Sequence, residues 1–418
     1  MMIADSSCRA AARTRSGTRA GQVVVARTVE EVEGLRGEWE AAGVSDIDSD
    51  IDYFLTVVKN APGVVRPHVV LIRRPGRPSL LAVARLELLG VPLAVGYRTV
   101  ARPQVRAVVV SFGGLVGVAG AGDEQLLAGE LRRALDSGEA DLLLVRKADV
   151  GGTVRDAVAG GVSWARRSHA QPVTRRWVAP VPDSFEVFLT HRRGRTRQKL
   201  RRYARVLERS YGEGLRVHRF EQPAEMAELC RDLEAVAART YQRGLGAAYC
   251  GSPLDLGLIE LGLRRGWYRA WMLYLNGKPV AFWTGTAYAG TFTTGTPGYD
   301  PQHTKDRVGT YTMLKMVEDL CAAADVRWLN FGPGDAEYKA AYGTPERAEA
   351  DIFVVRRGLR PVTVSLTAGA LSQVNSWGRQ LTQDTGWGRR LKRAWRGSMT
   401  ASRTEGTEST EAAESTGG

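Results

Sequence analysis

The order of strand and helix signals in the second half of this 418-residue chain limits its fold more than any other feature. Apolar runs at 270–275 and 279–287 flank Asn276-Gly277, a residue pair typical of a two-residue hairpin turn. A second turn ends at Gly290 and leads into a third run at 291–296. The pattern predicts an antiparallel meander of three strands.

A helix and a fourth strand are predicted after the meander. The helix opens at Asp306, has apolar residues on one face and ends near Ala324, and residues 327–331 return as a strand. A glycine stands at the helix entrance, where backbone N–H groups can hold phosphate oxygens, and a neighbouring arginine can add a forked cation. The candidate phosphate-binding residues are therefore Arg307, Val308, Gly309, Thr310 and Tyr311.

A glycine-rich turn follows the fourth strand. Gly332-Pro-Gly334 combines two residues of unusual backbone freedom with one of fixed dihedral, so it predicts a sharp turn at the strand end. Such a turn would bring two acids, a phenol and an amine to one place. The candidate catalytic residues are Asp335, Glu337, Tyr338 and Lys339. The alternative is a solvated turn whose charges have no chemical role.

Three segments of this half belong to one recognisable pattern. They are the arginine-rich stretch 192–208, the run from Gly277-Lys-Pro-Val-Ala281 through 297–301 to Gly309, and the stretch 330–339. Together they resemble the BioF2-like or CelD-type branch of the GNAT acetyltransferases, which is related to the FemABX aminoacyltransferases, over residues from about 184 to 355. Two positions differ from the family pattern. Arg307-Val-Gly309 replaces a Ser-Pro-Gly-like entry, and Asn330 replaces a frequent aspartate.

The resemblance implies an enzyme that transfers an acetyl or other acyl group from acyl-CoA to an amine. It implies that residues 307–311 bind the CoA pyrophosphate, and that a backbone N–H of the strand at 291–296 stabilises the oxyanion. The acceptor amine must also lose a proton. For the remaining roles the resemblance offers Asp335 or Glu337 as the base, Tyr338 or Tyr342 as the proton donor to the thiolate, and Lys339 as a contact to CoA phosphate or to the oxyanion. The acceptor stays open, with a small molecule or a cell-envelope precursor as the expected partner.

The first half of the chain repeats this order of elements. Strands are predicted at 23–26, 68–73, 80–89, 107–111 and 141–145, and helices at 29–42, 51–60 and 123–137; the second half adds a strand at 215–220 and a helix at 226–242. We therefore expect an α/β fold of tandem GNAT-like domains at 22–180 and 184–358, each with a mixed, mostly antiparallel sheet flanked by helices. The first domain is expected to be degenerate and to shape the acceptor site. Its glycine loop, 117–122, lacks a nearby arginine, and residues 146–149 lack the glycine-rich turn.

Residues 192–209 contain nine basic residues and a single acid. One interpretation is the solvated face of a helix, with Leu200, Tyr203, Val206 and Leu207 turned inward. A second is the wall of an anionic site, for which Arg197 and Arg201, together with the later Tyr342, are candidate substrate-binding residues. A third is a surface for RNA.

Sequence motifs favour acyl-CoA over aminoacyl-tRNA as the acyl donor. No RNA-module motif occurs, and no heptad arm of the kind that contacts tRNA in FemABX enzymes is present, which makes a nucleic-acid partner the weaker expectation. Three alternatives stay open: FemABX-like transfer from aminoacyl-tRNA, an RNA-binding protein that uses the basic helix, and a non-catalytic GNAT scaffold in a polysaccharide-assembly complex.

Composition argues against a disulfide framework and against a metal site. The four cysteines lie far apart, and the five histidines show no ligand spacing. The longest apolar stretches fall short of 18 residues, so no membrane span is predicted and a cytoplasmic location is expected.

Both ends of the chain differ from the rest. Residues 1–21 are predicted to be a disordered leader without the apolar core of a signal peptide. The basic segment 359–398 contains tryptophans, and its part 376–397 is expected either to pack as a terminal helix or to lie on an anionic membrane surface. Residues 399–418 are rich in Ser, Thr, Glu and Gly and predict a disordered tail.

Overall fold

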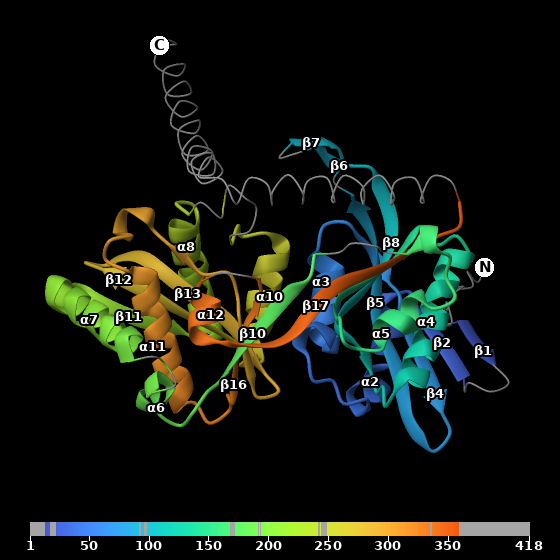
Figure 1. Cartoon of the computed structure of the whole chain (residues 1–418), viewed down its shortest axis with the longest axis horizontal. Helices are drawn as coiled ribbons and strands as arrows, with labels where there is room; N and C mark the ends of the chain where they lie inside the picture. The colour runs from blue at the N-terminus through green and yellow to red at the C-terminus, as the bar shows by residue number, and fades with distance from the viewer. Residues whose placement is uncertain are drawn as a thin grey trace, which may run out of the picture. The chain divides into compact units, whose positions relative to one another are not determined.

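The structure, a computed structural model, divides into two compact units (Figure 1). It describes residues 13–16, 22–91, 93–95, 98–167, 172–190, 192, 194–240, 243, 249–334 and 337–358. The first unit comprises 1–94, 99–178 and 331–370, and the second comprises 95–98, 179–330 and 371–418. The chain passes from one unit to the other within β10 (Thr174–Pro180) and again within β16 (Trp328–Pro333).

The first unit is built on a mostly antiparallel sheet. Its strands, in the order in which they pair, are β1 (Arg13–Ser16), β2 (Gln22–Ala26), β4 (Val69–Arg74), β5 (Arg77–Gly90), β8 (Gln104–Val116), β9 (Leu142–Asp149), β17 (Thr344–Val355) and β10. β3 (Val64–Pro67) also pairs with β5, whereas β6 (Leu93–Val95) and β7 (Arg98–Ala101) lie outside this sheet. β8 and β9 run parallel, with Ala107 opposite Leu142 and Val110 opposite Val145.

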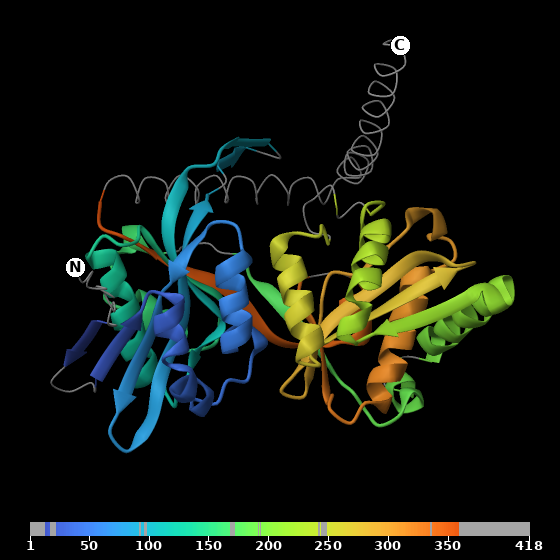
Figure 2. The same cartoon turned by 180° about the vertical axis from the view of Figure 1, so that it is seen from behind.

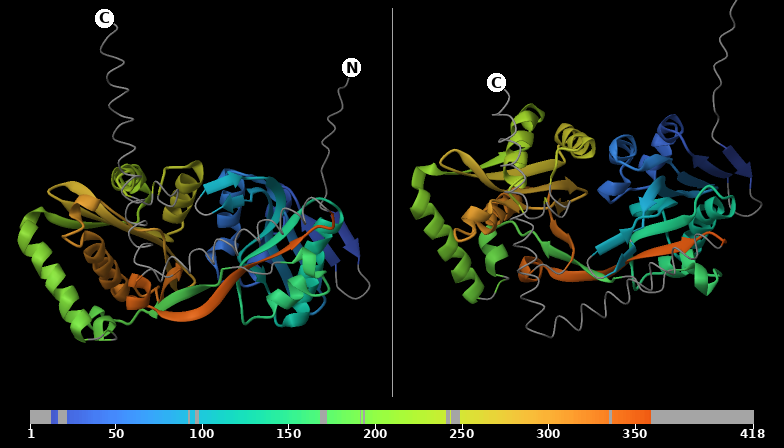
Figure 3. Two further views of the ribbon diagram at one scale, coloured as in Figure 1. Left: turned by 45° about the horizontal axis from the view of Figure 1, so that its top comes forward. Right: turned by 90° about the horizontal axis from the view of Figure 1, so that it is seen from above.

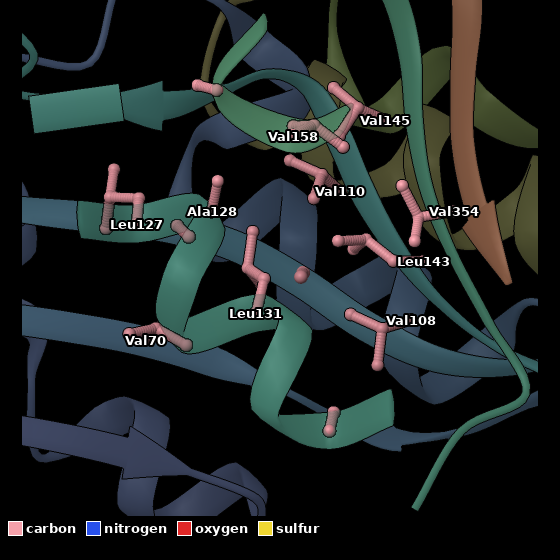
Figure 4. Close-up of a cluster of buried hydrophobic side chains, with 14 of the residues drawn as sticks. Val70, Val108, Val110, Leu127, Ala128, Leu131, Leu143, Val145, Val158 and Val354 are labelled. Carbon is pink, nitrogen blue, oxygen red and sulfur yellow. The ribbon is translucent and has the colours of Figure 1, made fainter. Parts of the chain in front are cut away.

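Alternating apolar residues give this sheet two buried faces. Val70 and Ile72 of β4 belong to the core beneath α4 (Ala121–Asp136) and α5 (Val154–Ala159), shown in Figure 4. Val69 and Leu71 belong to the core beneath α1 (Val29–Glu33), α2 (Arg36–Ala41) and α3 (Ile51–Asn60), whose blue ribbons come forward in Figure 2. Two short 3₁₀ segments, η1 (Ile47–Ser49) and η2 (Trp164–Arg166), and α12 (Glu337–Tyr342) complete the unit.

The second unit has the predicted meander at its centre. Its strands pair in the order β16, β14 (Thr291–Thr294), β13 (Lys278–Tyr288), β12 (Tyr268–Leu275) and β11 (Leu215–Phe220), and β15 (Gly298–Tyr299) pairs with β13. β14 and β16 run parallel, and the meander strands run antiparallel.

Helices cover both faces of this second sheet (Figure 3). α8 (Met226–Ala237) and α10 (Pro253–Arg264) pack on the face of Met272 and Tyr274. α7 (Gly194–Tyr211) and α11 (Val308–Ala322) pack on the face of Leu273 and Leu275, with α6 (Phe185–Thr190) beside them. The short segments η3 (Gly212–Gly214), η4 (Pro223–Glu225) and η5 (Pro301–His303) connect these elements.

The predicted α/β class with mostly antiparallel sheets is confirmed. The predicted helix 29–42 is wrong as one element, because Gly34 ends α1 with its N–H bonded to the carbonyls of Glu30 and Val32. The sequence analysis also missed β10 and β17, whose charged residues and prolines hide the strand pattern. β17 pairs with β9 and β10, which is why residues from Phe331 onward group with the first unit.

Candidate active site

The glycine-rich turn is held rigidly in the first unit. Gly332 and Gly334 adopt positive φ angles of 72° and 117°, which other residues rarely adopt. The Gly334 N–H donates to the carbonyl of Arg175 at 3.1 Å, and Trp177 Nε1 donates to the Gly334 carbonyl at 2.9 Å. The turn is therefore fixed to β10 through both backbone groups of its last glycine.

Two of the four candidate catalytic side chains meet at this turn. Lys339 Nζ donates to the Pro333 carbonyl at 2.7 Å and lies 6.0 Å from the centre of the Tyr338 ring. Tyr338 packs edge-on against Phe331, with ring centres 6.1 Å apart. Lys339 thus closes the turn from α12, a structural contact that the sequence does not reveal.

The other candidate residues near the turn are either buried or lie outside the residues that the structure describes. Asp335 falls outside the described residues, and so does the side chain of Glu337, which opens α12. Tyr342 is only 7% exposed. The backbone next to it is also tightly packed, since a Cβ on Gly343 would lie 3.2 Å from the Cβ of Trp177.

The start of α11 in the second unit has the features of an anion site. Arg307 precedes the helix in the left-handed region, at φ 58° and ψ 33°, a costly conformation for arginine. Its carbonyl accepts from the N–H groups of Thr310 and Tyr311 at 2.9 and 3.1 Å. Within the described part of the chain, the N–H groups of Val308 and Gly309 donate no hydrogen bond. Two free donors therefore stand at the positive end of a 15-residue helix.

Aromatic residues of α7 fix the approach to this helix start. The Arg307 guanidinium lies 5.6 Å from the centre of the Tyr203 ring. Tyr211 Oη donates to Asp306 Oδ2 at 3.2 Å, and Tyr311 Oη donates to Glu208 Oε1 at 3.1 Å. Burial and then the Glu208 charge raise the pKa of Tyr311, so this phenol stays protonated.

Contacts from the sheet fix the first turn of α11 from the other side. Trp283 Nε1 donates to the Gly309 carbonyl at 2.9 Å, and a Cβ on Gly309 would lie 3.4 Å from the Tyr299 ring. The Val308 side chain is fully buried in the core, so only its backbone is available to a ligand. The candidate residues at 307–311 thus lie together, and their backbone is more available to a ligand than their side chains.

The parallel pairing of β14 with β16 in the second unit is short. Thr293 and Asn330 are the last paired residues, with Asn330 Nδ2 and Thr293 Oγ1 3.4 Å apart. Beyond them Gly295 donates its N–H to the Thr284 carbonyl of β13 at 2.8 Å. The predicted strand 291–296 therefore ends at Thr294, where its pairing with β16 has already stopped.

The basic run forms α7 as predicted, with one error. Leu200 and Leu207 are buried, but Val206 is 54% exposed because it lies outside the inward stripe that these residues define. Arg201 pairs with Glu186 of α6 on the surface, and Arg197 is half-buried on the same helix.

Comparison with known families agrees with this geometry. Residues 194–340 match the family model described as an acetyltransferase (GNAT) domain. The chain contains a GNAT domain. The structure of FemX is similar, with 9% identity and a TM-score of 0.53 over 81% of this chain and 98% of FemX, which shows a shared fold.

Two further solved structures are similar at lower scores. They are a tandem GNAT protein from the clavulanic acid biosynthesis pathway (13% identity, TM-score 0.43, 81% of this chain and 99% of that chain) and L-PGS from Bacillus licheniformis (14% identity, TM-score 0.46, 82% and 96%). No curated protein matches the chain in sequence.

In the first unit, the helix that follows the same strand order is α4, and an acid of its first turn bonds to the loop before it and to an arginine. Asp123 accepts from the Ala119 N–H at 2.9 Å and from Arg74 Nη1 at 2.7 Å. The backbone bond, together with Arg74, lowers the pKa of Asp123. No arginine lies near the loop 117–122 in the sequence, but β4 supplies Arg74 from a distant part of the chain. The arginine beside this helix start is thus paired with a carboxylate, whereas Arg307 at the start of α11 forms no ion pair within the described residues.

The described residues contain neither a membrane-spanning helix nor a metal-binding cluster. None of the helices in the described ranges is long and apolar enough to cross a membrane. No group of three or more His, Cys, Asp or Glu side chains suited to a metal ion occurs in the part of the chain that the structure describes. The basic segment 376–397, proposed from the sequence to contact a membrane, lies outside the described residues.

Proposed function

We propose that the protein is an N-acyltransferase that uses acyl-CoA, with acetyl-CoA as the simplest donor, to acylate an amine of a small molecule or cell-envelope precursor. The GNAT domain supports acyl transfer in general. One observation supports the CoA donor. The start of α11 keeps the N–H groups of Val308 and Gly309 free and holds Arg307 in a strained conformation beside them.

The residues at this helix start fit a diphosphate. Phosphate oxygens accept hydrogen bonds from paired N–H groups at a helix start, and the helix dipole favours their charge. Glycine at 309 leaves space that a side chain would occupy. Arg307 would add a cation and Tyr203 would hold its guanidinium in place.

The chemistry needs a group that accepts the proton of the acceptor amine. Carboxylates such as Asp335 and Glu337 suit this role, and general acid–base catalysis typically contributes about 10² to 10⁴ in rate. Lys339 is better explained as an anchor of the turn, since its ammonium already bonds to the Pro333 carbonyl. Tyr338 is the more accessible proton donor, because Tyr342 is buried.

A thermal-shift panel with acetyl-CoA, longer acyl-CoAs and aminoacyl-tRNA tests the donor. We expect stabilisation by acyl-CoA, because a ligand that binds only the folded state raises its melting temperature. Release of free CoA thiol with a panel of amines then identifies the acceptor. Stabilisation by aminoacyl-tRNA alone would refute the CoA donor and favour FemABX-like aminoacyl transfer, and no stabilisation by any donor would favour a non-catalytic scaffold.

A further inference from the structure

In the first unit, the parallel strands β8 and β9 become irregular just after their pairing ends. Ala84 of β5 pairs with Val110, but Ala82 pairs with Leu115, so the intervening residues 111–114 form a large bulge in β8. Gly113 in this bulge has φ 62°, and a Cβ there would lie 2.6 Å from the Cβ of Asp46. Bulges are over-represented next to functional sites, where they redirect side chains.

A second irregularity lies opposite the first, on β9. Lys147 adopts φ 53°, and its N–H donates to Asp351 Oδ1 at 2.9 Å. The pairing of β9 with β17 shifts register between Ala350 and Ile352 at the same level. Two neighbouring strands thus depart from regular pairing at their carboxyl ends, where ligands bind in sheets with parallel strands.

Two glutamates near these bulges are each shared by two arginines. Glu87 pairs with Arg85 and lies 3.9 Å from Arg146 of β9. Glu349 Oε1 accepts from the Nε atoms of Arg176 and Arg347, at 2.6 and 2.9 Å. Each group of one glutamate and two arginines therefore carries a net positive charge.

Glu349 and Arg176 are buried, whereas Arg347 is partly exposed. The Glu349 side chain is fully buried, and its Oε2 has no partner within the described part of the chain. The Phe112 ring of the β8 bulge lies beneath both arginines, 4.1 Å from the Arg176 guanidinium. A fully buried carboxylate oxygen without a donor is costly, because its desolvation is not compensated.

Two aspartates lie close enough to both arginine–glutamate groups to interact with their charges. η1 carries Asp46 and Asp48 onto the bulge, where Ser49 Oγ donates to the Phe112 carbonyl at 2.8 Å. Burial and then the Asp48 charge raise the pKa of Asp46 to about 7, and Arg176 and Arg347 oppose this rise. Burial also raises the pKa of Asp48, against the charges of Arg85, Arg176 and Arg146. Among the described residues, neither carboxylate forms an ion pair, and both residues are mostly buried but keep partial contact with solvent.

The stability of the folded protein does not by itself explain this arrangement of charges. Buried ion pairs contribute little net stability, because desolvation offsets their attraction. Two side-by-side carboxylates with raised pKa values and a buried oxygen without a donor add to the cost. Such features cluster at functional sites.

We propose that this part of the first unit binds a small molecule that carries both an ammonium group and a carboxylate. Asp46 and Asp48 would receive the ammonium group. Arg146 and Arg347, whose side chains are 45% and 39% exposed, would receive the carboxylate. This binding does not depend on the proposed N-acyltransferase function.

Binding can be measured on the full chain without any acyl donor. The twenty amino acids are screened by thermal shift at millimolar concentration, and the best one is titrated by calorimetry against its N-acetyl and methyl ester derivatives. We expect each derivative to bind at least about tenfold more weakly, because each lacks one of the two charges. An amino acid that binds no better than its derivatives, or the absence of any binding, would overturn the proposal.

Matched variants locate the site. Asp48→Asn and Arg146→Gln should each weaken amino-acid binding at least about tenfold. Arg133→Gln serves as the control, since Arg133 is an exposed arginine of the same unit that pairs with Glu130 on its own helix. Unchanged binding in both cluster variants would contradict the placement. Acetyl-CoA titration of the same variants separates the two proposals, because loss of amino-acid binding with intact CoA binding concerns this site alone.

Discussion

At the scale of single residues, the glycine-rich turn at the end of β16 involves two candidates with different expected roles. Lys339 is a structural cation, and Asp335 is the candidate base. Lys339 bonds to the Pro333 carbonyl and so holds the turn that precedes Asp335 in the sequence. A rigid mount suits a proton-transfer group, because catalysis depends on the placement of the reacting atoms.

Asp335→Asn should lower acyl-transfer turnover at least about 100-fold, because the amide cannot accept the amine proton. The melting temperature should stay nearly unchanged, and Glu337→Gln provides the matched comparison. A loss of melting temperature without a loss of rate at saturating acceptor would show that Asp335 anchors the turn instead.

Asp46 predicts a pH dependence of stability. Its pKa is raised from 3.8 to about 7 in the folded protein, so between these values the folded state binds more protons than the unfolded state. Stability should therefore fall as pH rises through this window. Compared with Asp46→Asn, the native protein should lose melting temperature between pH 5 and pH 8. Parallel melting curves for the two proteins across this range would show that Asp46 does not titrate there.

At the scale of elements, the helix starts of the two units differ in the charged groups beside them. Both leave the N–H groups of their first two residues without a partner among the described residues, but Asp123 lies in the first turn of α4 and pairs with Arg74, whereas Arg307 at α11 forms no ion pair in the described part of the chain. A carboxylate in the first turn disfavours a phosphate, so we expect the anion at α11 and not at α4.

Asp123→Ala should destabilise the protein by about 1 kcal/mol, since it removes a first-turn carboxylate that favours the helix dipole, accepts the Ala119 N–H and pairs with Arg74. Asp136 lies at the other end of the same helix, where a negative charge opposes the dipole. Asp136→Ala should therefore be neutral or slightly stabilising in urea denaturation. Equal losses for the two variants would contradict this role of Asp123.

At the scale of the whole molecule, the sequence predicts local order better than long-range contacts. Asn276-Gly277 and the apolar runs around it predict the meander well, because turn chemistry and strand period are local signals. β10 and β17 were missed, since their burial depends on partners far along the chain.

The candidate sites show the same contrast. The α11 start was predicted from Gly309, the neighbouring Arg307 and the meander before them, but its Tyr203 and Glu208 contacts come from α7, a hundred residues away. The charged cluster around Glu349 joins side chains from η1 and four strands of the first unit, and no spacing in the sequence reveals it.

The most direct test of the account is a calorimetric titration of the full chain with acetyl-CoA. Gly309→Asp places a negative charge at the second residue of α11, and the nearest contact of its Cβ, at 3.4 Å, is ordinary. Gly122→Asp makes the same change at the second residue of α4, where the space is open. We predict that Gly309→Asp weakens binding at least about tenfold, or 1.4 kcal/mol, while Gly122→Asp leaves it unchanged. Equal affinity for the native protein and a folded Gly309→Asp variant would contradict the placement of CoA at α11.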